Sequence, residues 1–431
     1  MITGQTIPLI FGIRPEFLLF GLTLLGVALF HHHTLKVGLV GLTAILIFKF
    51  LFDPAFNLPE HLFGHVAFAD QIIHKSMRVG EWGVLLNLFG LLIGFALLAK
   101  HFEDSRVPEF LPNLLPNDWK GPLVLLLAVF VLSSFLDNIA AALIGGTIAL
   151  VVFNHRVHLG YIAAIVAASN AGGSGSVIGD TTTTLMWIEG VHPFNVFHAY
   201  IAAFVAVAFF SVIASIQQDR YQPIQKDAKS DVKIDWLRLG IVILILLFAI
   251  FTNVFFDFPA LGVWIAILIG ATFRKTDWHE AKNAISGSIF LLSLVTCASL
   301  MPVEELPVAS WQTAFSLGFV SAVFDNIPLT KLALEQNGYD WGMLAYAVGF
   351  GGSIIWFGSS AGVAISSKFH QARSVVKWLK SGWHIFVAYI LGFFVLLFIM
   401  GWEPQIIPKK NSSGTVQTSS QQISLPYPKT K

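Results

Sequence analysis

Three aspartates lie within stretches of the chain that are otherwise apolar. Asp137 and Asp325 are each followed directly by an asparagine, Asn138 and Asn326, and Asp180 precedes a run of four threonines. A carboxylate at membrane depth costs about 2.5–3.5 kcal/mol on insertion scales, so such a residue usually marks a functional site. Carboxylate, amide and hydroxyl oxygens are ligands for hard cations rather than for soft metals. These residues therefore predict a site for a small cation.

A site of this kind can also exchange protons. A carboxyl group removed from water holds its proton more tightly, and a bound cation displaces that proton. One group can then carry a metal ion and a proton in turn, which is the minimum chemistry of cation/proton antiport. The basic residues nearest to the acidic segments, Lys331 and Lys368, are expected at helix ends with their ammonium groups reaching water. They are not placed to clamp an anion.

The composition indicates a membrane protein. Of 431 residues, 55% are hydrophobic and 12% are charged, whereas soluble domains carry about 25% charged residues. The net charge of +1 argues against a nucleic-acid partner. The single cysteine, Cys297, excludes an internal disulfide framework and a cysteine-based metal centre. We expect the lipid bilayer and small cations as partners, and no cofactor.

Apolar runs long enough to cross a bilayer lie near residues 15–30, 35–52, 82–99, 194–216, 239–256, 259–273, 284–302 and 381–402. Four further apolar stretches, 121–153, 159–188, 310–336 and 342–367, are interrupted by polar or glycine-rich residues. The breaks in the second and fourth are expected at Gly172-Gly173 and Gly351-Gly352, where unwound carbonyl groups could also bind the ion. Backbone leaves a helix at membrane depth only where protein or a water-filled cavity satisfies its polar groups.

The two halves of the chain can be overlaid. In each, an Asp-Asn pair is followed by a Gly-Gly-Ser segment in the same order, which indicates an internal duplication. Basic residues crowd 217–235, 274–282 and 368–380, and we assign these segments to the cytoplasm. The assignment requires 121–153 and 310–336 to be re-entrant hairpins, while 159–188 and 342–367 cross as broken helices.

The predicted fold is therefore an all-α polytopic membrane protein with two inverted-topology repeats. The first repeat spans 1–216 and the second 236–402, joined by a cytoplasmic linker at 217–235 and followed by a disordered tail at 403–431. About ten transmembrane helices, two re-entrant hairpins and two broken helices result from this assignment.

Other interpretations of the same residues remain open. Asp137, Asp180 and Asp325 could simply cap helix ends, and the glycines could serve close packing. Gly172-Gly-Ser-Gly175 fits the short GxSG pattern of intramembrane serine proteases, which would need a base such as His198 or His384. We expect a transporter and no enzyme activity, because the GxSG pattern is weak and a purely structural protein would have no reason to retain duplicated buried acids.

Four segments carry a resemblance to a known family: Ser133–Asn138, Asn170–Thr184, Asp325–Leu329 and Gly351–Val363. They resemble the signature segments of NhaD-type sodium/proton antiporters, within the ion transporter superfamily that also includes arsenite and di- and tricarboxylate carriers. The resemblance implies inverted repeats, homodimers and elevator-like movement of the ion-binding part. The chain departs from the family pattern at Gly175-Ser-Val177 and at Trp356, which bear on the identity of the ion.

Carried over residue by residue, the resemblance implies a cation- and proton-binding site made of Asp137, Asn138, Asp180, Thr181, Thr182, Asp325, Asn326, Ser353, Ser359 and Ser360. We accordingly expect a secondary transporter in a bacterial inner membrane that exchanges Na⁺, or Li⁺, for H⁺. The alternative is a Na⁺- or H⁺-coupled carrier of a dicarboxylate, citrate or arsenite. The acidic residue in each half is the feature that opposes an anionic substrate.

Overall fold

The computed structural model describes residues 9–407 except 11, 31 and 226–231, so parts of the predicted linker and most of the predicted tail lie outside the described residues. The described residues form helices and contain no β-strand. The α-helices are α1 Pro15–Leu29, α2 Thr34–Phe52, α3 Leu58–Phe63, α4 Phe68–Ile73, α5 Trp82–Asp104, α6 Val107–Phe110, α7 Lys120–Ser133, α8 Asn138–Val152, α9 Leu159–Ser174, α10 Thr181–Ile188, α11 Pro193–Phe197, α12 Ala199–Tyr221, α13 Trp236–Phe256, α14 Pro259–Phe273, α15 Trp278–Ser299, α16 Trp311–Ser321, α17 Asn326–Gln336, α18 Trp341–Gly351, α19 Ser360–Lys368, α20 Val375–Ser381 and α21 Trp383–Met400.

Several of these helices can cross a membrane. Six helical segments of the described chain are long and apolar enough to do so, namely α2, α5, α11 with α12, α13, α15 and α21. Helices α1, α7, α8 and α14 are shorter but also apolar. The prediction of an all-helical, multi-pass integral membrane protein is confirmed.

Polar residues fix where several of the helices begin. The side chain of Asp235 accepts hydrogen bonds from backbone N–H groups in the first turn of α13, and Asp277 and Asp340 do the same for α15 and α18. Ser310 and Thr313 form a reciprocal capping box at the start of α16. A cap of this type contributes about 1 kcal/mol. The apolar runs therefore become helices with defined starts rather than frayed ones.

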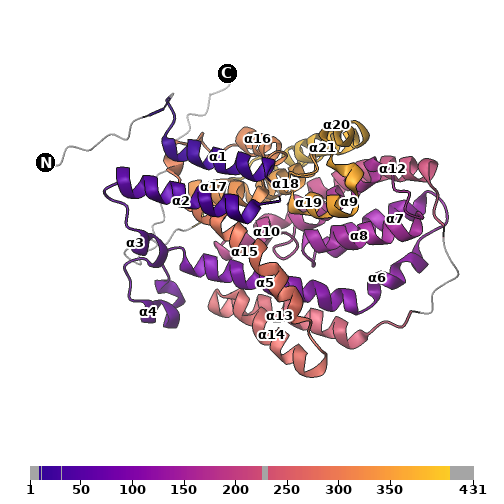
Figure 1. Cartoon of the computed structure of the whole chain (residues 1–431), viewed down its shortest axis with the longest axis horizontal. Coiled ribbons are helices and arrows are strands. Elements are labelled where there is room, and N and C mark those ends of the chain that lie inside the picture. The colour runs from indigo at the N-terminus through magenta and orange to yellow at the C-terminus, as the bar shows by residue number, and fades with distance from the viewer. Residues whose placement is uncertain (1–8, 11, 31, 226–231, 408–431) are drawn as a thin grey trace, which may run out of the picture.

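The helices pack as two groups that meet along one interface. Group one comprises α1, α2, α5 and α13–α15, and group two comprises α7–α12 and α16–α21. In Figure 1, α5, α13 and α14 form the lower part of the molecule, whereas α7, α8 and α16–α21 form the upper and right-hand part. Contacts between the groups run mainly from α15 to α17 and from α5 to α10. Helices α9 and α18 are almost wholly buried and form the centre of group two.

The interrupted stretches become pairs of helices. Residues 134–137 separate α7 from α8, and 322–325 separate α16 from α17, while 175–180 and 352–359 separate α9 from α10 and α18 from α19. Of the four glycines predicted at the breaks, Gly172, Gly173 and Gly351 lie in the last turn of a helix, and Gly352 is the first residue of a gap. A Cβ on Gly172 would stand 2.0 Å from the Phe130 carbonyl oxygen, and one on Gly351 would stand 2.4 Å from that of Gly318. Their role in the structure is thus close helix packing.

One ordered segment is not expected from the apolar pattern. Residues 53–81, between α2 and α5, form α3, α4 and a short 3₁₀ turn, Lys75–Met77. The buried Gln71 organises this segment, because its amide donates to two backbone carbonyls and its oxygen accepts from Val79 N and Trp82 Nε1. The segment places Glu81 at the start of α5.

Candidate cation site

Asp180 lies at the centre of the polar residues in group two. It caps α10, and its carboxylate is buried, with 2% of the residue exposed. Asn138 Nδ2 donates to Asp180 Oδ1 across 3.2 Å, and Asn326 Nδ2 approaches Oδ2 at 3.5 Å. These asparagines are the first residues of α8 and α17. Both Asp-Asn pairs, which are far apart in sequence, therefore converge on this one carboxylate.

Asn170, on α9, connects the same centre to the second broken stretch. Its Oδ1 accepts a hydrogen bond from Asn138 Nδ2 at 3.0 Å. Its Nδ2 donates to Ser353 Oγ at 2.9 Å and to Ser359 Oγ at 3.0 Å. Asn170 is missing from the site predicted from the sequence. The sequence feature that could have indicated Asn170 is that it is the single amide side chain in a helix whose other buried residues are nearly all apolar or small.

Asp137 and Asp325 are helix caps as well as members of the polar centre. Oδ1 of Asp137 accepts from Ile139 N at 2.8 Å, and Oδ1 of Asp325 accepts from Ile327 N at 3.0 Å. Oδ2 of Asp325 accepts from Ser360 Oγ at 3.4 Å. The partial positive charge at a helix N-terminus stabilises an ionised carboxylate there. Capping uses one oxygen of each aspartate, so it does not prevent the other from binding an ion.

The threonines that follow Asp180 serve different purposes. The hydroxyls of Thr183 and Thr184 donate to backbone carbonyls of the 173–180 segment, including those of Ser176 and Val177. At the first break these two carbonyl groups therefore already accept hydrogen bonds from the chain itself. The Thr182 hydroxyl is buried and has no hydrogen-bond partner among the described residues. Since buried polar groups are normally paired, this hydroxyl is a candidate ligand.

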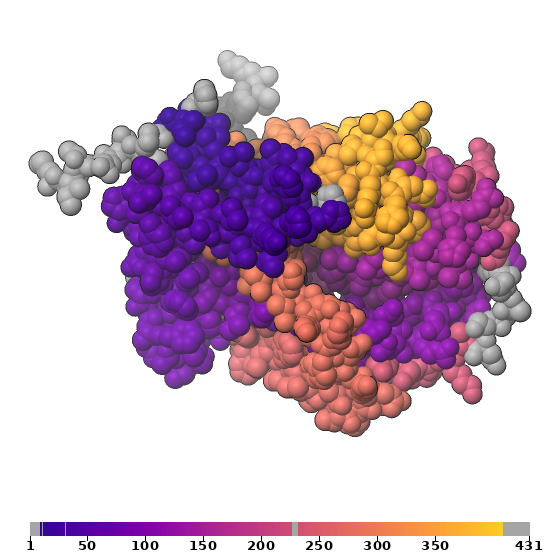
Figure 2. All heavy atoms as spheres, viewed as in Figure 1, coloured from indigo at the N-terminus to yellow at the C-terminus, as the bar shows by residue number. Residues whose placement is uncertain are grey.

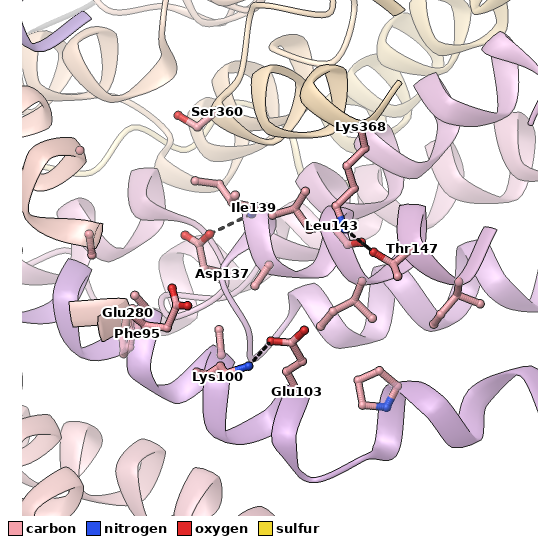
Figure 3. A pocket seen from close by; sticks show the side chains of 18 of the residues that line it. Phe95, Lys100, Glu103, Asp137, Ile139, Leu143, Thr147, Glu280, Ser360 and Lys368 are labelled. Atoms are coloured by element: carbon pink, nitrogen blue, oxygen red, sulfur yellow. Dashed lines mark hydrogen bonds and ion pairs between the residues drawn. The ribbon is translucent and has the colours of Figure 1, made fainter. Parts of the chain in front are cut away.

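Two cavities reach the aspartates from the interface between the groups. The larger, about 800 Å³, is lined by Asp137, Thr181 and Ser360 at one part and by Lys100 and Lys368 at another. Figure 3 shows Asp137 and Ser360 facing it, and in Figure 2 the surface is hollowed beside the orange α15.

The smaller cavity, about 240 Å³, is lined by Asp325, Ser359 and Ser360. It lies against α1, α2 and α15 of group one, so it too is at the interface. Ser360 lines both cavities. Asp137 and Asp325 are thus each reached by a cavity, whereas Asp180 lines neither of the two.

The nearest lysines differ in their surroundings. Lys368 ends α19, is exposed, and donates to the Thr147 hydroxyl at 2.6 Å, as expected for a helix-end lysine. Lys331 does not reach water, and the prediction for it was wrong. Its side chain is fully buried and pairs with Glu81, Glu189 and Glu335. Two of these partners, Glu81 and Glu189, lie outside α17. The position of Lys331 in the sequence therefore does not indicate that its ammonium group is paired inside the protein.

The residues of the protease-like pattern do not form a nucleophile and base. Ser174 Oγ is buried and donates to the Ala171 carbonyl at 2.8 Å. His198 Nε2 lies 2.7 Å from Asp340 Oδ1, the residue that caps α18. Within the part of the chain that the structure describes, no hydrogen bond joins Ser174 to a histidine.

Buried carboxylates that broken helices bring together beside open cavities are typical of the ion sites of multi-pass membrane transporters. The chain belongs to the citrate transporter family, whose model matches residues 24–351. It is 26% identical over 341 residues to Sodium/proton antiporter 1 of Arabidopsis thaliana, a match that covers 68% of this chain and 57% of that protein. The relatives carry the names of transporters rather than of enzymes.

Two further relatives have similar names. Sodium/proton antiporter 2 of Arabidopsis thaliana is 25% identical over 355 residues, which cover 69% of this chain and 80% of that protein. The Na⁺/H⁺ antiporter NhaD of Vibrio cholerae is 24% identical over 317 residues, covering 61% and 66% respectively. The chain thus spans between about half and four fifths of the length of these curated relatives.

Proposed function

We propose that the protein exchanges Na⁺, or Li⁺, for H⁺ across a membrane by alternating access. The observation that carries the proposal is the convergence of Asn138 and Asn326 on the buried Asp180 carboxylate, with Asp137 and Asp325 each reached by a cavity. An all-oxygen set with three carboxylates suits a hard cation rather than a soft metal. The names of the relatives agree with this chemistry.

In this proposal the carboxylates exchange the charge. Asp137, Asp180 and Asp325 bind either protons or the cation, and Thr181, Thr182 and Ser360 add neutral oxygen ligands. Asn138, Asn326, Ser353 and Ser359 hold the carboxylates and the broken helices in place. The transported ions are substrates, and the residues of the site imply no resident cofactor.

The proposed architecture is a pair of inverted repeats. Its support is a set of matching local arrangements in the two halves. In each half an aspartate caps the second helix of a helix pair, and a glycine near the end of the following helix lies against a carbonyl of the first. The two halves differ at the next cap: Asp180 caps α10 in the first half, and Ser359 caps α19 at the equivalent position in the second. The third carboxylate therefore comes from the first half alone.

Several features of the assembly also belong to the proposal. We assign segments 217–235, 274–282 and 368–380 to the cytoplasm of a bacterial cell, with the protein in the inner membrane as a homodimer. The larger cavity is lined by Val232, Glu280 and Lys368 from these three segments. It would accordingly open toward the cytoplasm, which makes the described conformation inward-facing.

A coupled anion carrier is the second candidate, because the matching family model is described as a citrate transporter. The same site would then bind Na⁺ first, and the cation would screen the aspartates from an anionic substrate. Against it, no lysine or arginine contacts Asp137, Asp180 or Asp325 in the described residues. Counterflow of labelled citrate or dicarboxylate in proteoliposomes separates this candidate from the first.

The test uses acridine-orange fluorescence in everted vesicles that hold a respiration-driven pH gradient. Na⁺, Li⁺, K⁺ and citrate are added separately to vesicles with the wild-type chain. Dequenching by Na⁺ or Li⁺ that is absent with Asp137→Asn and with Asp325→Asn supports cation/proton antiport at this site. No response to any cation from well-inserted protein contradicts it.

A further inference from the structure

Lys331 lies in a charged cluster outside the proposed cation site. Its ammonium nitrogen is 2.9 Å from Glu81 Oε2 and 2.7 Å from Glu335 Oε1, and it donates a hydrogen bond to Glu189 Oε1. The lysine side chain has no exposed surface. A buried charge is tolerated only where opposite charges compensate it. Lys331 has three such partners, which is more than its own charge requires.

The cluster connects the two helix groups. Lys331 and Glu335 belong to α17, and Glu189 directly follows α10, so these three are parts of group two. Glu81 precedes the first residue of α5 and belongs to group one. The contact between Lys331 and Glu81 is therefore the ion pair of the cluster that crosses the interface.

The cluster is located away from the larger cavity on the same interface. That cavity follows α5 from Leu92 to Glu103. Glu81 stands before the other end of α5, roughly 16 Å from Leu92 at about 1.5 Å per helical residue. The interface is thus open beside the second half of α5 and closed by charged side chains at its start.

The pair that crosses the interface can separate without leaving the buried Lys331 unpaired. Glu81 Oε2 accepts no hydrogen bond, whereas Glu189 accepts one from the ammonium group. If Glu81 moves away, Lys331 keeps both Glu189 and Glu335 on its own side. The large cost of breaking a buried ion pair arises when a charge loses all compensation. Lys331 does not lose it, and Glu81 then needs water in place of the lysine.

The cluster is also connected to the proposed cation site through two short helices. Helix α10 begins after Asp180 and leads to Glu189, and α17 begins after Asp325 and carries Lys331. We propose that the Lys331–Glu81 ion pair is a latch that keeps this end of the interface closed while the cavities are open, and that it separates when the cavities close. This inference rests on the proposed alternating-access function.

The test measures conformation rather than transport. Leu143 lines the larger cavity, and Cys297 is buried, so Leu143→Cys in a Cys297→Ser background gives one reporter thiol. Its rate of labelling by a membrane-impermeant maleimide is measured in the full chain, in everted and right-side-out vesicles. Glu81→Gln removes the carboxylate charge that pairs with Lys331 across the interface and leaves the size of the side chain nearly unchanged.

Glu335→Gln is the matched control, because it removes one carboxylate from the same cluster but leaves the crossing pair intact. We expect Glu81→Gln to lower the labelling rate several-fold, since loss of the latch favours the state with closed cavities, while Glu335→Gln leaves the rate near the parent value. Equal rates for Glu81→Gln and its parent, or equal reductions by both substitutions, would overturn the latch.

A second substitution covers the case in which Glu81→Gln does not fold. Glu81→Asp keeps the charge but withdraws it by one methylene, so labelling should fall in the same direction and by less. An unchanged rate in a monodisperse Glu81→Asp protein also contradicts the proposal. The labelling measurement involves no transported ion. If the vesicle assay contradicts cation/proton antiport, the labelling rates still show whether the ion pair controls access to the cavity.

Discussion

The Asn170 amide nitrogen lies 2.9 Å from the Ser353 hydroxyl oxygen, although 183 residues separate them in the chain. The contact joins α9, which leads to Asp180, to the segment that follows α18. Asn170 also accepts from Asn138, so one amide links three of the elements around the polar centre. Movements of the two broken stretches relative to each other would have to break this link.

Replacing Asp180 by Asn should abolish cation-dependent proton exchange. The substitution removes the central charge but keeps a side chain of similar shape between Asn138 and Asn326, so the protein should still fold. The measurement is acridine-orange dequenching by Na⁺ and Li⁺, alongside the amount of inserted protein. Asp118→Asn, at an exposed loop position, serves as the matched control and should retain exchange. Exchange at the control's level in the Asp180 variant would remove this carboxylate from the mechanism.

Asn170→Ala should weaken the apparent affinity for the cation. It deletes hydrogen bonds to Asn138, Ser353 and Ser359, and a net loss of about 1.4 kcal/mol, near that of a single hydrogen bond, corresponds to about tenfold. We therefore expect the Na⁺ concentration for half-maximal dequenching to rise about tenfold or more. Ser169→Ala is the control, since the Ser169 hydroxyl donates to the Val166 carbonyl of its own helix. Equal half-maximal concentrations in both variants would speak against a role for Asn170.

Gly172→Ala should destabilise the protein. The added methyl group would stand 2.0 Å from the Phe130 carbonyl oxygen, which belongs to the backbone of α7 and cannot move independently. Overpacking of this kind costs about 1–3 kcal/mol. Thermal denaturation in detergent, followed by size-exclusion chromatography, should show a lower midpoint than wild type. Gly240→Ala, where no atom lies within 4 Å of the new methyl group, should melt no lower than wild type; a parallel decrease there would undermine the packing argument.

The link between Asp235 and Arg274 predicts a pH-dependent contribution to stability. The Arg274 guanidinium donates to Asp235 at 2.9 Å and holds the pKa of that carboxyl below its usual value. A lowered pKa in the folded state means that the stabilisation is complete above the unfolded pKa, about 3.9, and is lost as pH falls through the folded pKa. Asp235→Asn, which can still cap α13, should therefore lower the melting temperature at neutral pH.

The same substitution should have no effect once the wild-type carboxyl is protonated. Melting curves of wild type and Asp235→Asn are expected to converge as the pH is lowered below about 4. Asp277→Asn provides a comparison, because Asp277 caps α15 in the same way and forms no ion pair with the residues that the structure describes. A difference between wild type and Asp235→Asn that stays constant with pH would indicate that the arginine contact contributes nothing through charge.

The apolar runs were sufficient to predict the membrane class, because an apolar stretch long enough to cross a bilayer is rare in a soluble domain. The polar centre was partly predictable, since Asp137, Asp180 and Asp325 are conspicuous in apolar sequence. Asn170 and the cluster around Lys331 were not, because their partners lie on distant helices and no local pattern indicates them. The importance of Gln71 for residues 53–81 likewise depends on tertiary contacts.

The threonine hydroxyls that donate to the carbonyls of Ser176 and Val177 bear on the ion selectivity of the proposed site. With those backbone dipoles engaged, the strongest ligands left at the first break are fully charged carboxylates. Attraction to a full charge grows as the ionic radius shrinks, so a site of high field strength favours Li⁺ and Na⁺ over K⁺. Discrimination against potassium would then arise from the charge of the ligands rather than from the size of a rigid carbonyl cage.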